Sequence, residues 1–171
     1  GGDRVGLGWN LEWDGRDHDN WPRSGTYAEV KQVFHPKTLG SDWSYAVQSL
    51  DVRGYLPTPL RGALACGAFW EGTTGDVPFD QLSMPDGTRR LRGLVKGRLA
   101  DRQQADLQLE WRVPLFWRFG ATVFADAGKV GNDASDLARN RVHYAFGAGG
   151  RMALNPSRKV NIRGDLSWVD D

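Results

Sequence analysis

The stretch Asp106-Leu-Gln-Leu-Glu-Trp-Arg-Val113 alternates without a break between polar and apolar residues, and this period of two decides the fold. The stretch from Gly120 to Gly128 continues it, with alanine and valine on one face and Thr122, Phe124 and Asp126 on the other. Successive side chains of a β-strand point to opposite faces of the sheet. Two such strands joined by a short turn therefore predict an antiparallel pair with one apolar and one polar face.

The same alternation extends along almost the whole chain and predicts an all-β fold of antiparallel strands, with no confident helix. The third predicted strand alternates poorly. Several predicted strands are longer than the globular mean of about 5–6 residues and suit the roughly 9–11 residues of a membrane-spanning strand. The eight predicted strands cover residues 4–14, 26–34, 43–55, 61–71, 106–114, 120–128, 142–154 and 160–168.

Length and composition limit the functional classes. A chain of 171 residues is long enough for one domain, here 1–171, with a sizeable core. A net charge of +1 gives no bulk electrostatic case for a nucleic-acid partner. Cys66 is the only cysteine, which excludes an internal disulfide. No apolar run approaches the ~20 residues of a membrane helix, whereas a membrane β-barrel keeps its mean hydropathy low by alternation.

The alternation alone does not say which face of the sheet is inside. A soluble barrel fills its interior with apolar side chains, whereas a transmembrane barrel turns its apolar face to lipid and places aromatic girdles at both interfaces. Strand length favours the transmembrane barrel over a soluble barrel or sandwich. We expect an interfacial girdle built from scattered tryptophans near the predicted strand ends: Trp9, Trp13, Trp43, Trp70, Trp117 and Trp168.

A long polar segment, about 72–104, separates the fourth predicted strand from the fifth and contains Arg92. Loops of this length in compact domains are usually functional or disordered. Glu110 and Asp126 lie on the polar faces of the two strands that follow. This arrangement suggests a loop that folds back into a barrel, where the guanidinium meets the two carboxylates. The alternative is a solvated loop arginine, with both carboxylates merely lining a wet lumen.

Several short motifs, taken in order, resemble the superfamily of outer-membrane assembly and translocation barrels that includes BamA and TamA and the bacterial surface antigen barrels. Leu91-Arg92-Gly93-Leu94 resembles its (V/I/L)-R-G-(F/Y) loop motif, with Leu94 where the family usually has an aromatic residue. Phe124-Ala-Asp126-Ala-Gly128 resembles its F-x-D-x-G strand, which follows a strand containing a glutamate, here Glu110. Further likenesses cover the turn 17–25 with Pro22 and the segment 77–79.

The resemblance implies a bacterial outer-membrane protein that inserts or translocates other outer-membrane polypeptides, without enzymatic activity, cofactor or metal. Its partners would be outer-membrane lipids and unfolded outer-membrane polypeptides. It also implies that Arg92 enters the barrel and locks the loop to Glu110 and Asp126, as charge-assisted hydrogen bonds would allow. Gly93 would permit the tight backbone at the loop tip. Gly128 completes the loop-lock motif.

Strand parity adds an expectation about completeness. Outer-membrane barrels have short periplasmic turns and long outer loops. If 72–104 is an outer loop, the segments 57–59, 114–118 and 155–159 are periplasmic turns, and Gly1 and Asp171 both lie on the outer side. The family's barrel has sixteen strands and periplasmic termini. We therefore expect a C-terminal portion of a larger barrel without its final strand, or a sheet completed by a second copy, because open edges cannot be satisfied in lipid.

Other readings have weaker support. Glu110 and Asp126 could form an acid/base pair for hydrolysis, but no nucleophile or cleft is signalled. The three histidines lie in separate segments without the spacing of metal ligands. The run Gly147-Ala-Gly-Gly150 is more typical of a strongly curved strand than of a dinucleotide site. Two functional alternatives stay open: a barrel that only anchors or secretes a fused passenger domain, and a soluble barrel that binds an apolar ligand.

Overall fold

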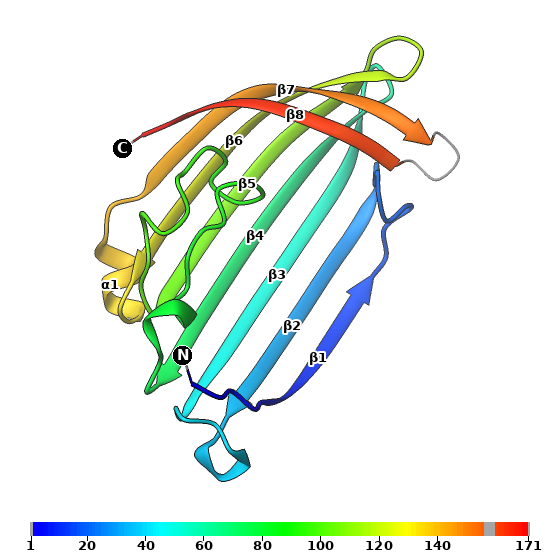
Figure 1. Ribbon diagram of the computed structural model, residues 1–171. Coiled ribbons are helices and arrows are strands. Elements are labelled where there is room, and N and C mark those ends of the chain that lie inside the picture. The colour runs from blue at the N-terminus through cyan, green and yellow to red at the C-terminus, as the bar shows by residue number, and fades with distance from the viewer. Residues whose placement is uncertain (1, 156–159, 171) are drawn as a thin grey trace.

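The computed structural model describes residues 2–155 and 160–170 and contains one antiparallel eight-stranded sheet in which sequence neighbours pair in the order β1 to β8 (Figure 1). The strands are β1 (Leu7–Asp14), β2 (Gly25–His35), β3 (Tyr45–Thr58), β4 (Gly62–Gly75), β5 (Gln103–Pro114), β6 (Phe119–Gly131), β7 (His143–Asn155) and β8 (Val160–Val169). The all-β, antiparallel prediction is confirmed. Most strands are longer than predicted because their ladders continue into the polar flanks.

Antiparallel order places alternate connections at opposite ends of the sheet. We call the end that carries the turns 59–61 and 115–118 the short-turn end, and the end that carries the segment 76–102 the long-loop end. The tight turns use residues with positive φ, namely Leu60, Arg61 and Trp117. A third short turn was predicted at 155–159, but residues 156–159 lie outside the described part of the chain.

The two faces of the sheet differ in the way that a membrane barrel requires. On the convex face, the apolar set of β5 is exposed, with Leu107 at 61% and Leu109 at 47%. On the concave face of the same strand, Asp106 and Glu110 are only 2% and 6% exposed. Exposed apolar side chains outside and buried polar side chains inside are the reverse of a soluble barrel. The structure thereby decides the question that alternation left open.

The segments between strands depart from the prediction in two places. The long loop is shorter than 72–104, because β4 continues to Gly75 and β5 already begins at Gln103. The polar segment 129–141 contains a short helix, α1 (Ala134–Arg139), where only a loop was predicted. Asp133 caps this helix by accepting a hydrogen bond from the backbone N–H of Asp136. Within the described residues, no helix has the length and apolar character needed to cross a membrane.

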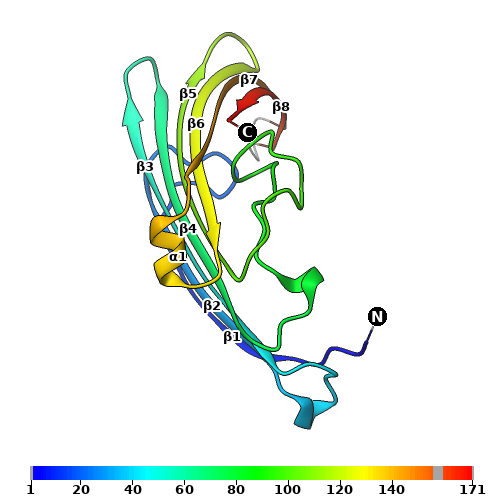
Figure 2. The ribbon, with the colours of Figure 1, turned by 90° about the vertical axis from the view of Figure 1, so that its left-hand side faces the viewer.

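The long loop folds onto the concave face of the sheet, as the side view shows (Figure 2). Leu91 and Leu94 of this loop are buried against Ala145 of β7, with Leu99 and Val169 packed around them. Leu94 thus fills its site as an aliphatic residue in place of the aromatic side chain that the family resemblance leads one to expect. Across the described residues, the sheet pairings do not join β1 to β8, so the sheet is curved but not closed.

Candidate functional site: the inserted loop and its anchors

The backbone of the loop tip is shaped by one aspartate and two glycines. Asp86 Oδ1 accepts hydrogen bonds from the backbone N–H groups of Thr88, Arg89 and Arg90 at 2.9, 2.6 and 3.0 Å. Burial acts to raise the pKa of Asp86, but these three donors outweigh it and hold the pKa below its usual range.

Gly87 and Gly93 adopt φ values of +67° and +94°, and the N–H of Gly93 donates to the Gly87 carbonyl at 2.9 Å. A side chain on Gly93 would be strained by this φ and would also meet Ser167 Oγ at 2.3 Å. The tip is therefore a tight, closed turn, and it turns Arg92 toward the sheet.

Arg92 lies in the middle of the concave face, 4% exposed, with both predicted carboxylates as partners. Its Nε and Nη2 donate to Asp126 Oδ2 and Oδ1, each at 2.8 Å, which is a bidentate arrangement. Its backbone N–H donates to Asp126 Oδ2 at 3.1 Å, and Nη1 donates to Glu110 Oε2. The structure thus brings together three residues that are 16 or more positions apart in the sequence. A buried guanidinium needs such partners, because an unpaired buried charge is costly.

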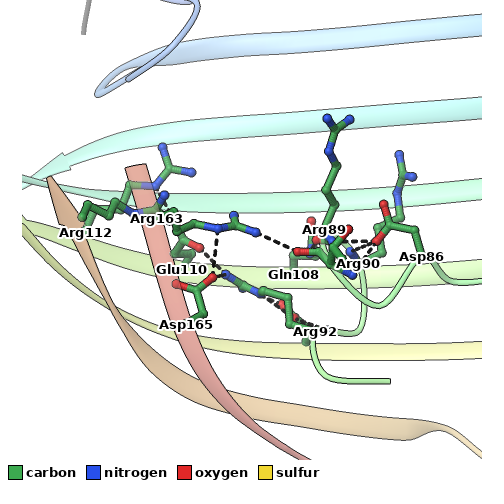
Figure 3. A network of polar contacts seen from close by, with 12 residues as sticks. Asp86, Arg89, Arg90, Arg92, Gln108, Glu110, Arg112, Arg163 and Asp165 are labelled. Atoms are coloured by element: carbon green, nitrogen blue, oxygen red, sulfur yellow. Dashed lines mark hydrogen bonds and ion pairs between the residues drawn. The ribbon is translucent and has the colours of Figure 1, made fainter. Parts of the chain in front are cut away.

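Glu110 is shared among three arginines. Besides Arg92, it accepts from Arg112 Nε at 2.6 Å and from Arg151 Nη2 at 2.5 Å, both through Oε1. Asp165 of β8 lies 3.9 Å from Arg92 Nη1 and 3.0 Å from Arg163 Nε (Figure 3). Both oxygens of Glu110 are therefore occupied by cations, which leaves no free carboxylate for the acid/base role considered above.

An aromatic ring packs against the central arginine. The Arg92 guanidinium carbon lies 3.5 Å from the ring centroid of Phe124, a cation–π contact in a buried site. The Cζ edge of the ring is close to Gly147, where an added Cβ would come within 2.7 Å of Phe124 Cζ and 2.0 Å of the Leu166 carbonyl oxygen. Gly128 is similarly constrained, because a Cβ there would lie 2.6 Å from Asp106 Oδ1. These glycines permit close packing in the wall around the loop.

Further contacts tie the loop to other strands. Arg90 Nη2 donates to Asp51 Oδ2 of β3 at 3.1 Å, and its guanidinium lies 3.3 Å from the ring centroid of Phe69 of β4. Gln108 of β5 donates to the Arg89 carbonyl, and Arg163 Nη2 of β8 donates to the Thr88 carbonyl at 2.7 Å (Figure 3). With Ala145 of β7 in the apolar cluster, the loop contacts every strand from β3 to β8.

The six predicted girdle tryptophans lie in different surroundings. Trp9, Trp13, Trp117 and Trp168 are well exposed, between 49% and 78%. Trp43 and Trp70 are half-buried, the first beside Arg4 and the second with its Nε1 donating to Gln103 at 3.4 Å. Their common role as an interfacial girdle stays a prediction.

Sequence reasoning missed the outer members of the ion network, namely Asp51, Arg90, Arg112, Arg151, Arg163 and Asp165. Strand parity could have found some of them, because Arg112 shares the polar face of Glu110, and Arg163 and Asp165 share one face of the last strand. Their pairing depends on which strands are neighbours and how strongly the sheet curves. The described residues contain no group of three or more His, Cys, Asp or Glu side chains that could hold a metal ion.

An antiparallel sheet with a lipid-suited convex face, a charged concave face and an inserted loop defines an outer-membrane β-barrel protein. Residues 2–158 match the Omp85 superfamily domain, and the chain therefore belongs to this superfamily. Its location is the bacterial outer membrane, and barrels of this family are in general not enzymes.

A crystal structure of BamA from Haemophilus ducreyi that lacks POTRA domains 1–3 has the same fold. The TM-score is 0.76 at 18% sequence identity, over 96% of the present chain. The chain spans 38% of the length of that protein. No curated protein sequence matches the chain.

Proposed function

We propose that this chain forms a wall of an outer-membrane barrel that inserts or translocates other outer-membrane polypeptides, and that Arg92 locks the long loop inside that barrel. The observation that carries the proposal is the hydrogen bonding of Arg92 to Asp126 and Glu110. This contact holds a loop from the long-loop end within the concave face. The superfamily match and the BamA-like fold support the wider role.

The lock acts by joining strands that otherwise touch only their neighbours. A sheet strand is held by its two ladders, whereas the loop tip makes ion pairs or hydrogen bonds to β3, β5, β6 and β8. The curvature of this part of the wall is therefore fixed from the inside. At the opposite edge of the sheet, β1 is not covered by the loop. While the rest of the wall keeps its shape, β1 can accept an incoming strand by β-augmentation.

We further propose that residues 1–171 form one barrel domain that is part of a larger barrel of sixteen strands, or that a second copy completes it. Among the described residues, the outer edges of β1 and β8 have no strand partner. This supports the proposal, because lipid offers no hydrogen bonds to an open edge. Cross-linking within the outer membrane from cysteines placed on β1 and β8 distinguishes a single longer chain from two copies.

The test is complementation in the native host, with the full-length protein carrying Arg92→Ala, Arg92→Lys or the control Arg118→Ala in the exposed turn at the short-turn end. We expect Arg92→Ala to lower the assembly of other outer-membrane proteins, measured by their heat-modifiability on gels. Arg92→Lys keeps the charge but loses the bidentate geometry, so it should have an intermediate effect. Arg118→Ala should be silent.

Two outcomes would contradict the proposal. Unchanged barrel stability and assembly in Arg92→Ala would remove the lock. Normal assembly of other outer-membrane proteins when the whole gene is deleted, together with loss of a fused passenger from the cell surface, would instead favour a dedicated anchor or secretion pore.

A further inference from the structure

A second polar region lies on the concave face, closer to the short-turn end than Arg92, and it shares Arg112, Arg151 and Arg163 with the ion network of the loop lock. It is a pocket of about 360 Å³ that is covered on one side by the segment between β1 and β2. Trp21 and Pro22 of that segment line it together with Tyr55 of β3. Its remaining walls are dominated by five arginines, Arg16, Arg53, Arg112, Arg151 and Arg163.

Aromatic rings hold several of these arginines in place. The guanidinium of Arg112 lies 5.6 Å from the ring of Trp21 and 5.7 Å from that of Tyr55, and Arg151 lies 5.4 Å from Trp21. Such cation–π contacts orient the planar forks while leaving N–H groups available at their edges. Arginine forks fixed in this way match the oxygens of a phosphate group.

The arginines outnumber the carboxylates that neutralise them. The ion pairs of the concave face form two groups. Arg53 and Arg90 pair with Asp51, whereas Arg92, Arg112, Arg151 and Arg163 pair with Glu110, Asp126 and Asp165. Asp19 is the acidic residue among the described lining of the pocket, and it is solvent-exposed. Within these two groups of ion pairs, the arginines outnumber the carboxylates by two.

One buried donor in the pocket wall is left without a partner. The side chain of Arg151 is only 10% exposed, yet among the described residues its Nε has no hydrogen-bond acceptor. Its Nη2 donates to Glu110, whereas its Nε is itself buried and has no acceptor among the described residues. A buried donor without an acceptor is destabilising, and an oxyanion bound beside this guanidinium would offset part of that cost.

We propose that this pocket binds the phosphate group of a phosphomonoester, a dianion that matches the excess charge and the arginine forks. This assignment goes beyond the loop lock and polypeptide insertion, although Arg151 and Arg163 also contact Glu110 and the loop carbonyl of Thr88. The shared chemistry allows two sources, a soluble phosphorylated compound or the headgroup of a membrane lipid. Arg151, Arg53 and Arg163 would hold the phosphate oxygens, with Trp21 beside the attached group.

The test uses the purified full-length protein in detergent, with isothermal titration of glycerol 3-phosphate at constant ionic strength. We expect saturable binding that weakens at least tenfold in Arg53→Gln and in Arg163→Gln, since each variant removes a charge-assisted hydrogen bond to the phosphate. Both side chains are partly exposed, so these variants should fold, and heat-modifiability on gels verifies it. Arg61→Gln, an exposed residue in a turn at the same end, is the matched control for charge.

A second arm distinguishes the source by using the protein in bilayer discs of phosphatidylcholine, with and without phosphatidic acid. A thermal stabilisation by phosphatidic acid that is lost in Arg53→Gln identifies a lipid headgroup, whereas binding of glycerol 3-phosphate alone identifies a soluble compound. The proposal is overturned if neither probe binds the wild type. It is equally overturned if Arg61→Gln weakens binding as much as the pocket variants, because the effect would then be net charge.

Discussion

Strands β1 and β5 lie in the same sheet and share the alternating pattern, yet their surroundings differ completely. All eight residues of β1 are exposed, on both faces. In β5, the concave-face residues Gln104, Asp106 and Glu110 are buried while their convex-face neighbours are exposed. The difference comes from the long loop, which lies over β5 and leaves β1 uncovered (Figure 2).

This contrast shows that the alternation of polar and apolar residues specifies the two faces of a strand. Whether the polar face is shielded from water depends on an inserted segment. A carboxylate on a wet face is solvated and needs no partner. A carboxylate under the loop must be paired, because burial removes its water. The contribution of a charged residue to stability should therefore depend on which of the two regions carries it.

The largest effect is expected from Arg92→Ala, which leaves Glu110 and Asp126 buried without their central cation. Removal of one partner from a buried ion pair costs about 3–5 kcal/mol. We expect a markedly lower unfolding temperature of the barrel, read by heat-modifiability on gels. Glu12→Ala in β1 should change stability by less than about 0.5 kcal/mol. Its carboxylate is exposed and accepts a single long hydrogen bond, 3.4 Å, from the Tyr27 hydroxyl. Equal losses of stability in Arg92→Ala and Glu12→Ala would contradict the inferred difference between the covered and the uncovered strands.

A smaller loss is expected from Asp126→Asn, which removes the negative charge but keeps the shape of the side chain. Glu110 still neutralises Arg92, so the cost should be near that of one charged hydrogen bond, about 2–3 kcal/mol. The double variant with Arg92→Ala should be less destabilised than the sum of the single variants, because the two residues are in contact. If the losses of stability of the two single variants simply add in the double variant, measured in the same gel assay, Asp126 does not act together with Arg92 in the lock.

Two glycines of the loop allow a controlled test of its close approach to the wall. Gly93 and Gly97 have similar φ values, +94° and +83°, but an added Cβ meets Ser167 only at Gly93 and nothing within 4 Å at Gly97. We expect Gly97→Ala to cost about 1 kcal/mol for the backbone alone. Gly93→Ala should cost about 2 kcal/mol, since the contact adds to the strain. If both alanine variants melt at the same temperature, the tip does not pack against β8.

The smallest effect should come from Asp86, which shapes the loop by accepting backbone hydrogen bonds, one of them from Arg90. Because its pKa is lowered in the folded protein, its contribution to stability is complete above the ordinary Asp pKa of about 3.9. The contribution is lost as the pH falls through the lower folded pKa. The stability difference between the wild type and Asp86→Asn should therefore shrink on acidification below pH 4.

The sequence was informative where a local rule applies. Alternation around Glu110 and Asp126 predicted the strands and the polar face, and the length of the segment around Arg92 marked it as special. The sequence alone could not choose the lumen side of the sheet, because a period of two is symmetric between the faces. Nor could it pair Arg90 with Asp51 or Arg151 with Glu110. These contacts join residues 39 and 41 positions apart and depend on curvature and strand order.

The uncovered strand β1 has a mechanical consequence. It is held by a single ladder to β2, whereas β3 to β8 are also tied to one another through the loop. Under a pulling force applied across the sheet, β1 and then β2 should separate in sequence, because each is held by its backbone ladders alone. The loop-bound wall should then yield in a single step at higher force. One continuous sheet thus combines two easily separated strands, β1 and β2, with a mechanically more resistant part, β3 to β8.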